Sequence, residues 1–444
     1  MLQTMHNRSL AATIELSLSS PMFQELGPDA RELLGVVAFF PQGVDENNLD
    51  WLFPSTSNGA NVFDKFCVLS LTYRSDSFIT MLAPLRDHLR PKDPLSSPLL
   101  HMTKERYFTR MSVNIDPDDP GFRESRWITS EDVNVEHLLD IFTTIDTNSD
   151  STWGACNNFI CHLAWHKKRL TILGPKIEGL PDAHPFKPNC LSWLSYLFYS
   201  VGNYMERRRI LTHALALWRE RGDDHEVAQT LRFLSDANLQ IGLHKEGIKQ
   251  VEEASQIVKQ LGDVMEEAEC SRALAELLES TKQFDAAEEA ASHAINLFSK
   301  NGDQYQVCVC RRVLGGIYQS NGETEKAIHH YEAALEIASS FDWFDLLFLV
   351  HSDLAGFFLA KSRFNDAQAH IRRARSHVAD NKLYLGCVTR MQAELWCEQH
   401  KLEEARSEAL QAADVFEKLG AANDLQLCRE LIQRIEGEMD KRQW

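Results

Sequence analysis

Small and apolar positions recur at a fixed interval through the second half of the chain. An alanine returns every 40 residues, with a last step of 38, at Ala214, Ala254, Ala294, Ala334, Ala374 and Ala412. A second column of small residues consists of Ser195, Ser235, Ala275, Gly315, Ala355 and Ala393. Antiparallel helices need small residues where their backbones approach closely and large apolar ones where gaps remain. The pattern therefore predicts six stacked helical hairpins, none of which could bury its apolar face alone.

The residues between the expected helices agree with this spacing. A Gly-Asp pair recurs 40 residues apart, at Gly222-Asp223, Gly262-Asp263 and Gly302-Asp303. Glycine adopts the left-handed conformation that ends a helix, and aspartate caps the first turn of the next helix. The turn within a hairpin is marked by Gly202, Gly242 and Gly322. We therefore expect one hairpin to end and the next to begin at each Gly-Asp pair.

One repeat carries a motif that resembles a known family. Tyr318 is followed by Gly322, and then by Ala327, Tyr331 and Ala334. This order resembles the tetratricopeptide repeat, whose usual unit is about 34 residues. The resemblance implies a mainly α fold, a right-handed αα superhelix of six repeats over residues 187–427. A capping helix and tail are expected over residues 428–444.

The resemblance also implies which side chains face a concave groove, because the first helix of each tetratricopeptide hairpin lines it. Three residues before the second small column stand Ser192, Arg232, Arg272, Arg312, Ser352 and Arg390. One residue after that column stand Tyr196, Asp236, Glu276, Gly316, Gly356 and Glu394. Three of the four arginines therefore have an acidic residue four positions later, which is the spacing of an intrahelical ion pair.

Two interpretations of these arginines remain open. One is a self-neutralising row of exposed i,i+4 pairs, each contributing only a few tenths of a kcal/mol. The other is a partner-binding row, in which guanidinium groups bind carboxylates or peptide carbonyls and the interleaved acids set the register. Arg312 has Gly316 where the acid would stand, so it is expected to be the most available arginine. Gly316 would also let a peptide backbone approach closely.

Family members that grip the C-termini of chaperones carry lysine in the first of these rows and asparagine in the second. Neither residue type occurs in its row in this sequence. An extended internal segment of a partner protein is therefore the expected ligand. The expected partner-binding residues are Arg232, Asp236, Arg272, Glu276, Arg312, Gly316, Arg390 and Glu394.

The first 92 residues follow a different pattern. A helix is expected to start near Gly27-Pro28-Asp29 and to stop at Pro41, with Leu33, Leu34, Val37 and Phe40 along one face. A short helix to about Leu52 and a third from Asn61 to Leu69 follow, before a strand signal at Phe78–Met81. Three helices and a small β element predict a winged-helix-like domain over residues 1–92. Residues 93–186 are expected to form a helical linker.

The segment Leu33–Val44 resembles the winged helix of signal-transducing NTPases of the NLR-like (STAND, NB-ARC) class, especially large fungal ones with C-terminal repeats. That class ends its wing with Met-His-Asp, where this chain has Met81-Leu82-Ala83. The chain contains no G-x-x-x-x-G-K-[ST] loop to cradle a triphosphate. The resemblance implies a regulatory joint, with an ATPase module that was lost or that a longer chain would supply.

Charge and composition narrow the class of partner. The formal net charge is -18 and the pI is about 5.4, so binding to nucleic acid or to an anionic membrane is disfavoured. The N-terminus lacks a signal-peptide layout, and no apolar run approaches the ~20 residues that span a bilayer. The ten cysteines show no disulfide spacing. These features predict a cytoplasmic protein with reduced thiols.

Sequence motifs for chemistry are incomplete. Asp146 opens a stretch like a calcium loop, but its sixth position is Ser151 and its twelfth is Asn157. Cys156, Cys161, His162 and His166 lack a second ligand pair with zinc spacing. We expect no catalysis, metal or cofactor, and leave the oligomeric state open. The expected function is a protein-interaction scaffold, adaptor or sensor; the alternative is the regulatory C-terminal portion of an NLR-like ATPase.

Overall fold

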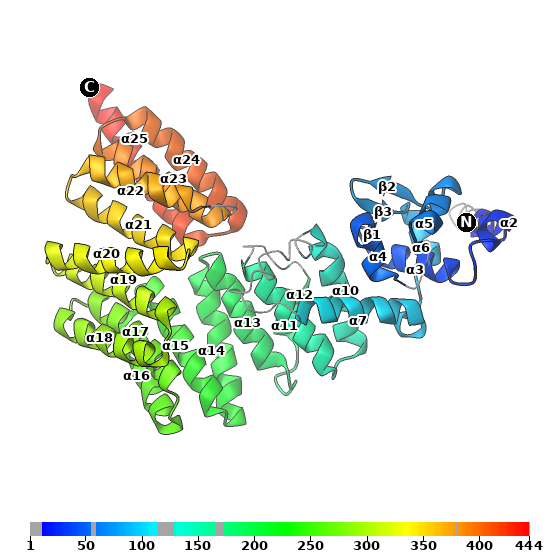
Figure 1. Cartoon of the computed structure of the whole chain (residues 1–444), viewed down its shortest axis with the longest axis horizontal. Coiled ribbons are helices and arrows are strands. Elements are labelled where there is room, and N and C mark those ends of the chain that lie inside the picture. Colours follow the sequence, from blue (N-terminus) through cyan, green and yellow to red (C-terminus); the bar gives the residue numbers. More distant parts are fainter. Residues whose placement is uncertain are drawn as a thin grey trace. The chain divides into compact units, whose positions relative to one another are not determined.

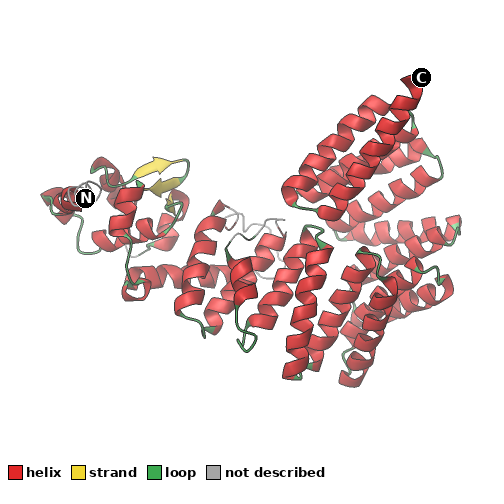
Figure 2. Cartoon of the chain, turned by 180° about the vertical axis from the view of Figure 1, so that it is seen from behind, coloured by secondary structure: helices red, strands yellow, loops and turns green. Residues whose placement is uncertain are grey.

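The computed structural model describes residues 11–54, 59–112, 128, 130–165, 170, 172–378 and 381–443. The chain forms two compact units, one of residues 1–162 and 170–179, the other of residues 163–169 and 180–444. Helices make up most of both units (Figures 1 and 2). Residues 1–10 and 113–127, inside the predicted winged-helix-like domain and linker, lie outside the described residues, as does His166.

The first unit combines short helices with one small sheet. Its helices are α2 (Pro21–Gln24), α3 (Ala30–Phe39), α4 (Leu49–Leu52), α5 (Gly59–Val68), α6 (Ala83–Leu89), α7 (Pro98–Ser112), α10 (Asp132–Ile145), α11 (Asp150–Trp165), whose last residues belong to the second unit, and α12 (Leu173–Gly179). The strands are β1 (Val44–Asp45), β2 (Tyr73–Ser75) and β3 (Phe78–Thr80). They pair antiparallel in the order β1-β3-β2, with Val44 and Arg74 both opposite Ile79.

Helix α3 is the centre of the first unit. The apolar side chains of residues 33–40 are each at most 2% exposed. This burial explains why the segment is the longest apolar run of the sequence. Gly43 has φ +85°, and a Cβ there would lie 2.1 Å from the carbonyl oxygen of Ile79, so the turn into β1 requires glycine. The Asn134 side chain of α10 accepts from the Gln42 amide and donates to the Gly43 carbonyl. Part of the expected linker thus packs in the same unit as the sheet.

The second unit is a solenoid of helical hairpins. Its helices are α13 (Lys187–Ser200), α14 (Tyr204–Arg221), α15 (Asp224–Gln240), α16 (His244–Leu261), α17 (Val264–Ser280), α18 (Phe284–Asn301), α19 (Gln304–Ser320), α20 (Thr324–Ser340), α21 (Phe344–Ala360), α22 (Phe364–Ser376), α23 (Lys382–Glu398), α24 (Leu402–Leu419) and α25 (Ala422–Gln443). Consecutive helices pack in pairs, and each odd-numbered helix from α15 to α21 also contacts the next odd-numbered one. The predicted α-solenoid fold is confirmed.

The periodic small residues lie where the sequence pattern predicts close packing. All six alanines of the first column are fully buried. In the second column, a Cβ on Gly315 would lie 2.6 Å from the Tyr331 ring, so that helix crossing admits no larger residue. A continuous apolar core runs from α17 to α23 through these contacts. The column alignment therefore identifies the true interior of the solenoid.

The Gly-Asp pairs form the predicted junctions. Gly222, Gly262 and Gly302 end their helices with φ between +71° and +79°. The aspartate that follows each glycine accepts a hydrogen bond from a backbone amide in the first turn of the next helix. Asn381 caps α23 in a similar way, since its side chain accepts a hydrogen bond from the Tyr384 amide.

The turn inside each hairpin uses one conformation in all six repeats. Glycine takes it at Gly202, Gly242 and Gly322, with φ between +72° and +85°. The same turn position in the other repeats is occupied by Lys282, Ser362 and His400, with φ between +55° and +60°. Sequence periodicity found only the glycines, because the tertiary packing of the helices imposes the turn on other residues as well.

The first and last parts of the solenoid meet. A Cβ built on Gly202, in the first hairpin turn, would lie 3.3 Å from the Asp424 carboxylate and 3.9 Å from the Ala421 Cβ. Burial raises the pKa of the neighbouring Tyr204 hydroxyl, with Tyr199 and Asp424 contributing in the same direction. The start of α25 therefore lies beside the turn between α13 and α14.

Candidate functional site

The first helices of successive hairpins form one face, called the inner face, which contains two adjoining cavities. The larger, of about 650 Å³, is lined by Leu239, Gln240, Glu276, Glu279, Ser280, Lys282, Phe284 and Ser320. The smaller, of about 290 Å³, is lined by Tyr199, Asp236, Leu239, Gln240, Arg272, Glu276, Tyr305, Gln306, Val309, Arg312, Leu346 and Leu349. Helices α13, α15, α17, α19 and α21 all contribute to the smaller cavity, so the inner face is concave.

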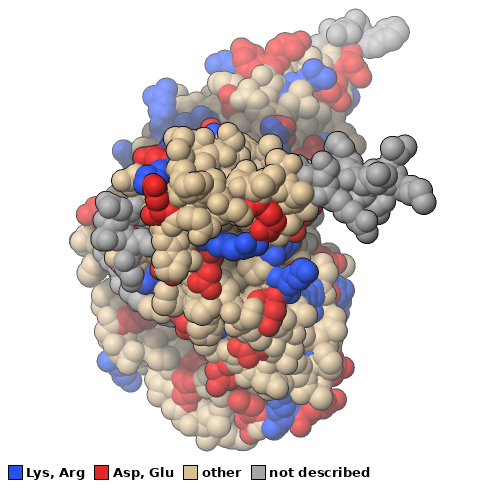
Figure 3. All heavy atoms as spheres, turned by 90° about the vertical axis from the view of Figure 1, so that its right-hand side faces the viewer, with Lys and Arg blue, Asp and Glu red and all other residues tan. Residues whose placement is uncertain are grey.

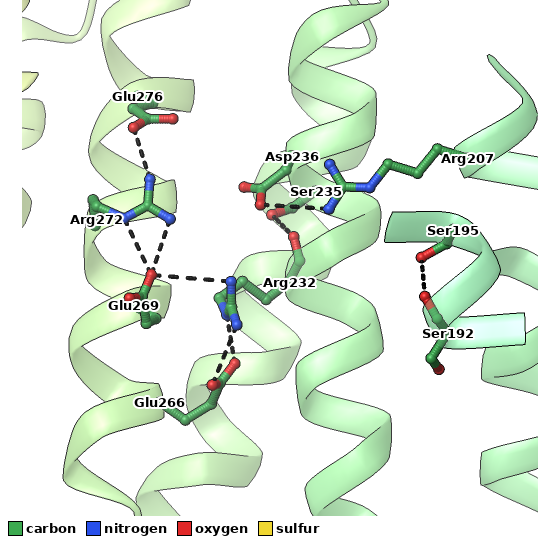
Figure 4. Close-up of polar contacts among 10 residues, drawn as sticks. All are labelled: Ser192, Ser195, Arg207, Arg232, Ser235, Asp236, Glu266, Glu269, Arg272 and Glu276. Carbon is green, nitrogen blue, oxygen red and sulfur yellow. Dashed lines mark hydrogen bonds and ion pairs between the residues drawn. The ribbon is translucent and has the colours of Figure 1, made fainter. Parts of the chain in front are cut away.

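Arg232 is paired across the repeat boundary, not within its own helix. Its Nε donates to Glu266 Oε1 of α17 at 2.5 Å, and its Nη1 lies 4.0 Å from Glu269 (Figure 4). The two side chains of the Arg232–Glu266 pair are only 9% and 10% exposed. The predicted intrahelical pair with Asp236 is wrong, because the repeat geometry brings two glutamates of α17 closer to the guanidinium.

Arg272 forms the predicted intrahelical pair and one more. Its Nη1 donates to Glu276 at 2.8 Å, and its Nη2 donates to Glu269 at 2.9 Å (Figure 4). Glu269 therefore stands between two arginines, one from each of two successive repeats. The Arg272 side chain is 15% exposed, so the row is not the exposed set of pairs that one interpretation expected.

Arg312 has an acidic partner, contrary to the prediction that it would be the most available arginine. Its Nη1 donates to Asp353 of α21 at 3.0 Å. Gly316, where an intrahelical acid would stand, instead lies next to α17, since a Cβ there would be 3.5 Å from Glu279 Oε1. The sequence pattern missed Asp353 because the pair spans 41 residues.

Arg207 is 3% exposed. The equivalent positions of the following repeats hold only small residues, namely Gly247, Ala287, Ala327, Ala367 and Ala405. The Arg207 guanidinium lies 4.4 Å from the Tyr199 ring centroid. Its Nη2 atom lies 4.0 Å from the Asp236 carboxylate (Figure 4). Among the residues that the structure describes, none accepts a hydrogen bond from the Nε or Nη1 atom of this buried side chain. Arg207 thus packs behind Tyr199 and Asp236, two of the residues that line the smaller cavity.

The remaining predicted pair belongs to another part of the inner face. Arg390 donates to Glu394 within α23, as the spacing predicts. Neither side chain lines the two cavities, to which α15, α17 and α19 contribute most residues. The structure thus brings Asp236, Arg272, Glu276 and Arg312 together at one cavity and leaves the α23 pair apart.

Three carboxylates on the first helices are partly buried, with 23% of the Glu276 side chain and 33% of the Asp353 side chain exposed. Burial raises the pKa of Glu276, although Arg272 opposes the shift, and burial likewise raises the pKa of Asp353 against Arg312. Burial also raises the pKa of Glu279, which accepts a hydrogen bond from Ser320 at 2.7 Å. Each of these anions would gain from a further cation.

The described residues contain no group of three or more His, Cys, Asp or Glu side chains arranged to hold a metal ion. No helix among them is both long and apolar enough to cross a bilayer. Basic and acidic side chains are interspersed over the face seen in Figure 3. The cavities of the inner face therefore remain the best candidate for function.

Several residues that shape this site carry no signal within their own helix. Glu266, Glu269 and Asp353 pair with arginines of a neighbouring repeat, 34 to 41 residues away. A search for opposite charges separated by about one repeat length would have found them. Glu279 and Gln240 lie at the C-terminal ends of their helices, where no periodic column marks them.

Comparison with known proteins gives the family of part of the chain. Residues 266–340 match the tetratricopeptide repeat family model. A search of curated proteins finds no matching sequence. A STAND signal-transduction ATPase with a tetratricopeptide repeat sensor, from Pyrococcus horikoshii, superposes with TM-score 0.51 and 14% identity. The match covers 94% of this chain but only 65% of that one. A Rap protein complexed with competence and sporulation factor gives TM-score 0.49 at 12% identity, covering 76% and 99%.

Proposed function

We propose that this chain is a non-catalytic protein-interaction scaffold, an adaptor or sensor, that binds an extended partner segment along the inner face. The observation that carries the proposal is the pair of cavities that share Leu239, Gln240 and Glu276 on a concave face. The tetratricopeptide match over residues 266–340 supports a protein partner. Neither nucleic acid nor a membrane is proposed as a partner, given the net charge of -18.

The geometry favours an extended segment as the ligand. Packed helices lie about 8–10 Å apart, so the five first helices from α13 to α21 span roughly 40 Å. An extended chain covers about 3.3 Å per residue, so a segment of about 12 residues would cross this face. A folded domain would meet only the rim, whereas an extended segment reaches the residues lining both cavities.

Among the eight predicted partner-binding residues, we propose different roles. Asp236, Glu276 and Gly316 are proposed to contact the segment directly. The four arginines, Arg232, Arg272, Arg312 and Arg390, already donate to carboxylates and are proposed to hold the wall in shape. Glu394 is proposed to belong to the wall through its pair with Arg390.

A display selection with random 12-residue peptides on the full chain tests this function. Gln240 is exposed and lines both cavities, so Gln240→Trp should block the inner face without disturbing the core. Glu289→Trp, at an exposed position of α18, is the matched control. We expect selected peptides to bind the control like the wild type and to bind Gln240→Trp at least tenfold more weakly. Peptides that ignore Gln240→Trp would reject the inner face as the binding site.

A second candidate is the regulatory portion of an NLR-like ATPase. Elements α3, β1, α4, α5, β2 and β3, with antiparallel order β1-β3-β2, are compatible with a winged helix. The fold similarity to the STAND protein over 94% of this chain supports it as well. The full-length transcript decides between the candidates. A phosphate loop encoded in frame upstream would support the ATPase, and a complete reading frame without one would exclude it.

We propose a cytoplasmic location. All ten cysteines are free thiols, and most are buried, which suits a reducing compartment. A fluorescent fusion of the full chain that accumulates in the cytosol would agree. Secretion of the fusion, or recovery of the chain with disulfide bonds, would contradict this location.

A further inference from the structure

Aromatic side chains continue from the smaller cavity in two directions. Tyr199 of α13 and Tyr305 of α19 both line that cavity. The Tyr199 ring stacks on Tyr196, three residues earlier, with ring centroids 6.0 Å apart and planes at 27°. The Tyr305 ring meets Trp343 at 5.1 Å, and Trp343 in turn stacks on Phe341 at 4.5 Å. These five residues are called the aromatic strip.

Much of the aromatic strip is open to solvent. The exposed fraction is 38% for Tyr196, 44% for Tyr199 and 53% for Phe341. Rings that fill the core of the solenoid are buried, as those of Tyr318 and Tyr331 are. The strip therefore presents ring surface that the fold leaves accessible to a partner.

The junction between α20 and α21 departs from the other junctions in a way that the fold does not require. Asp342 has φ +54°, at the place where Gly302 takes this conformation one repeat earlier. Trp343 stands where Asp303 caps the next helix, and its side chain makes no capping hydrogen bond. A left-handed residue with a Cβ and a lost cap both destabilise the junction. Such departures from local rules are typical of functional positions, so the Trp343 ring is a candidate for binding.

The charged side chains that line the two cavities cancel. Three are basic and three are acidic, namely Arg272, Arg312 and Lys282, and Asp236, Glu276 and Glu279. Arg272 donates to Glu276, and Arg312 donates to Asp353 of α21. A charged segment would find no net charge to complement and would compete with pairs that already exist. The lining therefore favours a segment without net charge.

Proline is the uncharged residue that suits an extended segment on exposed rings. A polyproline II helix covers about 3.1 Å per residue, so about 13 residues would span the roughly 40 Å of the inner face. Its rings pack on aromatic side chains, and its backbone is already ordered before binding, so little conformational entropy is lost. A leucine-rich segment would instead need an apolar pocket, which the paired charges at the smaller cavity do not provide.

We propose that the inner face binds a proline-rich segment in the polyproline II conformation. Its proline rings would lie on Tyr196 and Tyr199 at one end of the aromatic strip and on Trp343 and Phe341 at the other. Tyr305, which lines the smaller cavity and contacts Trp343, belongs to the path between these ends. The inference rests on the proposed function and names the class of its partner.

The peptides selected on the full chain provide the first test. We expect those that depend on Gln240 to be enriched in proline and to carry little net charge. A synthetic copy of one such peptide is then compared with its Pro→Ala versions by fluorescence anisotropy. Each proline that lies on a ring should contribute about fivefold in affinity. The affinity should change little with salt concentration, because binding neutralises no net charge.

Two variants remove rings while preserving the helices. Tyr196→Gln replaces a partly exposed ring at a position where the other repeats carry aspartate, glutamate or glycine. Asp342→Gly combined with Trp343→Asp restores the Gly-Asp junction of the preceding repeat, so the fold should be kept or stabilised, as urea denaturation would verify. Each variant should bind the selected peptide about fivefold more weakly. With both combined, the affinity lost on Pro→Ala replacement should be at least fivefold smaller than on the wild type.

A matched control is Tyr73→Gln. It removes a tyrosine ring that is 45% exposed on β2, in the first unit and away from the inner face. This control should bind the selected peptide and its Pro→Ala versions as the wild type does. If the junction variant loses its fold, Tyr196→Gln alone decides, and an unchanged affinity for the selected peptide would overturn the inference.

The failures of the two proposals are distinguishable. Peptides that depend on Gln240 but are not enriched in proline would overturn the proline-rich inference and leave the proposed function standing. A Pro→Ala loss that is as large on the combined variant as on the wild type would also overturn it. A selection that yields no peptide dependent on Gln240 would overturn the proposed function, and the inference with it.

Discussion

Replacing Glu266 by alanine should destabilise the second unit strongly, because it leaves the Arg232 guanidinium buried without its main partner. The Arg232–Glu266 pair is 2.5 Å long, and both side chains are at most 10% exposed. The Glu266 backbone amide would still be capped by Asp263, so the substitution removes the ion pair but keeps the helix start.

Removing one partner of a buried ion pair costs about 3–5 kcal/mol. Two residual contacts of Arg232 reduce this figure, namely Glu269 at 4.0 Å and the Phe233 ring centroid at 4.5 Å. We therefore expect a loss of about 2–3 kcal/mol in the free energy of unfolding. For a unit of this size that corresponds to a fall of roughly 5–10 °C in Tm.

Urea denaturation of the full chain, followed by circular dichroism, measures this loss. The control is Asp414→Ala, which breaks a 2.6 Å pair with Lys418 whose side chains are 59% and 74% exposed. An exposed pair contributes about 0–1 kcal/mol, so the control should change little. The double variant Arg232→Met/Glu266→Ala should recover most of the loss. Equal losses for Glu266→Ala and Asp414→Ala would refute the idea that burial makes the wall structural.

The structure fixes the direction in which three further changes should shift the free energy of unfolding. Lys282→Gly should raise the free energy of unfolding by about 1 kcal/mol, because φ +60° strains any residue with a Cβ. Gly315→Ala should lower the free energy of unfolding by about 1–3 kcal/mol, because the new Cβ would lie 2.6 Å from the Tyr331 ring. Gly316→Ala should leave the free energy of unfolding unchanged or raise it by up to ~1 kcal/mol, because alanine favours the helix more than glycine does. Burial, and after it the neighbouring His370, Arg373 and His377, lower the pKa of His351 to about 4. The free energy of unfolding should therefore fall as the pH drops from about 6.5 to 4, and His351→Gln should make that fall smaller.

Urea midpoints measure all three predictions, and each has an internal control. Gly242 has φ +80°, so Gly242→Ala should lower the free energy of unfolding by about as much as Lys282→Gly raises it. Gly315→Ala and Gly316→Ala serve as controls for each other; equal effects would contradict the packing at Tyr331. For His351, the unfolded chain binds a proton below pH ~6.5 while the folded chain does not, so a flat profile for the wild type would contradict its burial.

The solenoid was predictable because its signals are local or periodic. Each hairpin repeats every 40 residues or so, and the alanine column and the Gly-Asp junctions report directly on close packing and on capping. The turns at Lys282, Ser362 and His400 were not predictable in this way, because tertiary packing imposes φ values that these residues disfavour. Strands β1 and β2 were also too short to leave a periodic signal.

The candidate site was predictable only in part. The arginine row and the pairs of Arg272 and Arg390 follow from spacing within one helix. The partners of Arg232 and Arg312 come from the next repeat, so their identity depends on how successive hairpins are rotated. Intrahelical spacing therefore located the row of arginines but not the partners that Arg232 and Arg312 take from the next repeat.

The most direct test of the central claim is where a bound segment lies. A selected peptide carrying a benzophenone photo-crosslinker would be irradiated on the full chain, and the modified residues identified by mass spectrometry. Binding along the inner face predicts crosslinks to α15, α17 and α19, at residues such as Leu239 and Val309 that line the cavities. Crosslinks confined to the second helices α16 and α18, or to the first unit, would contradict the account.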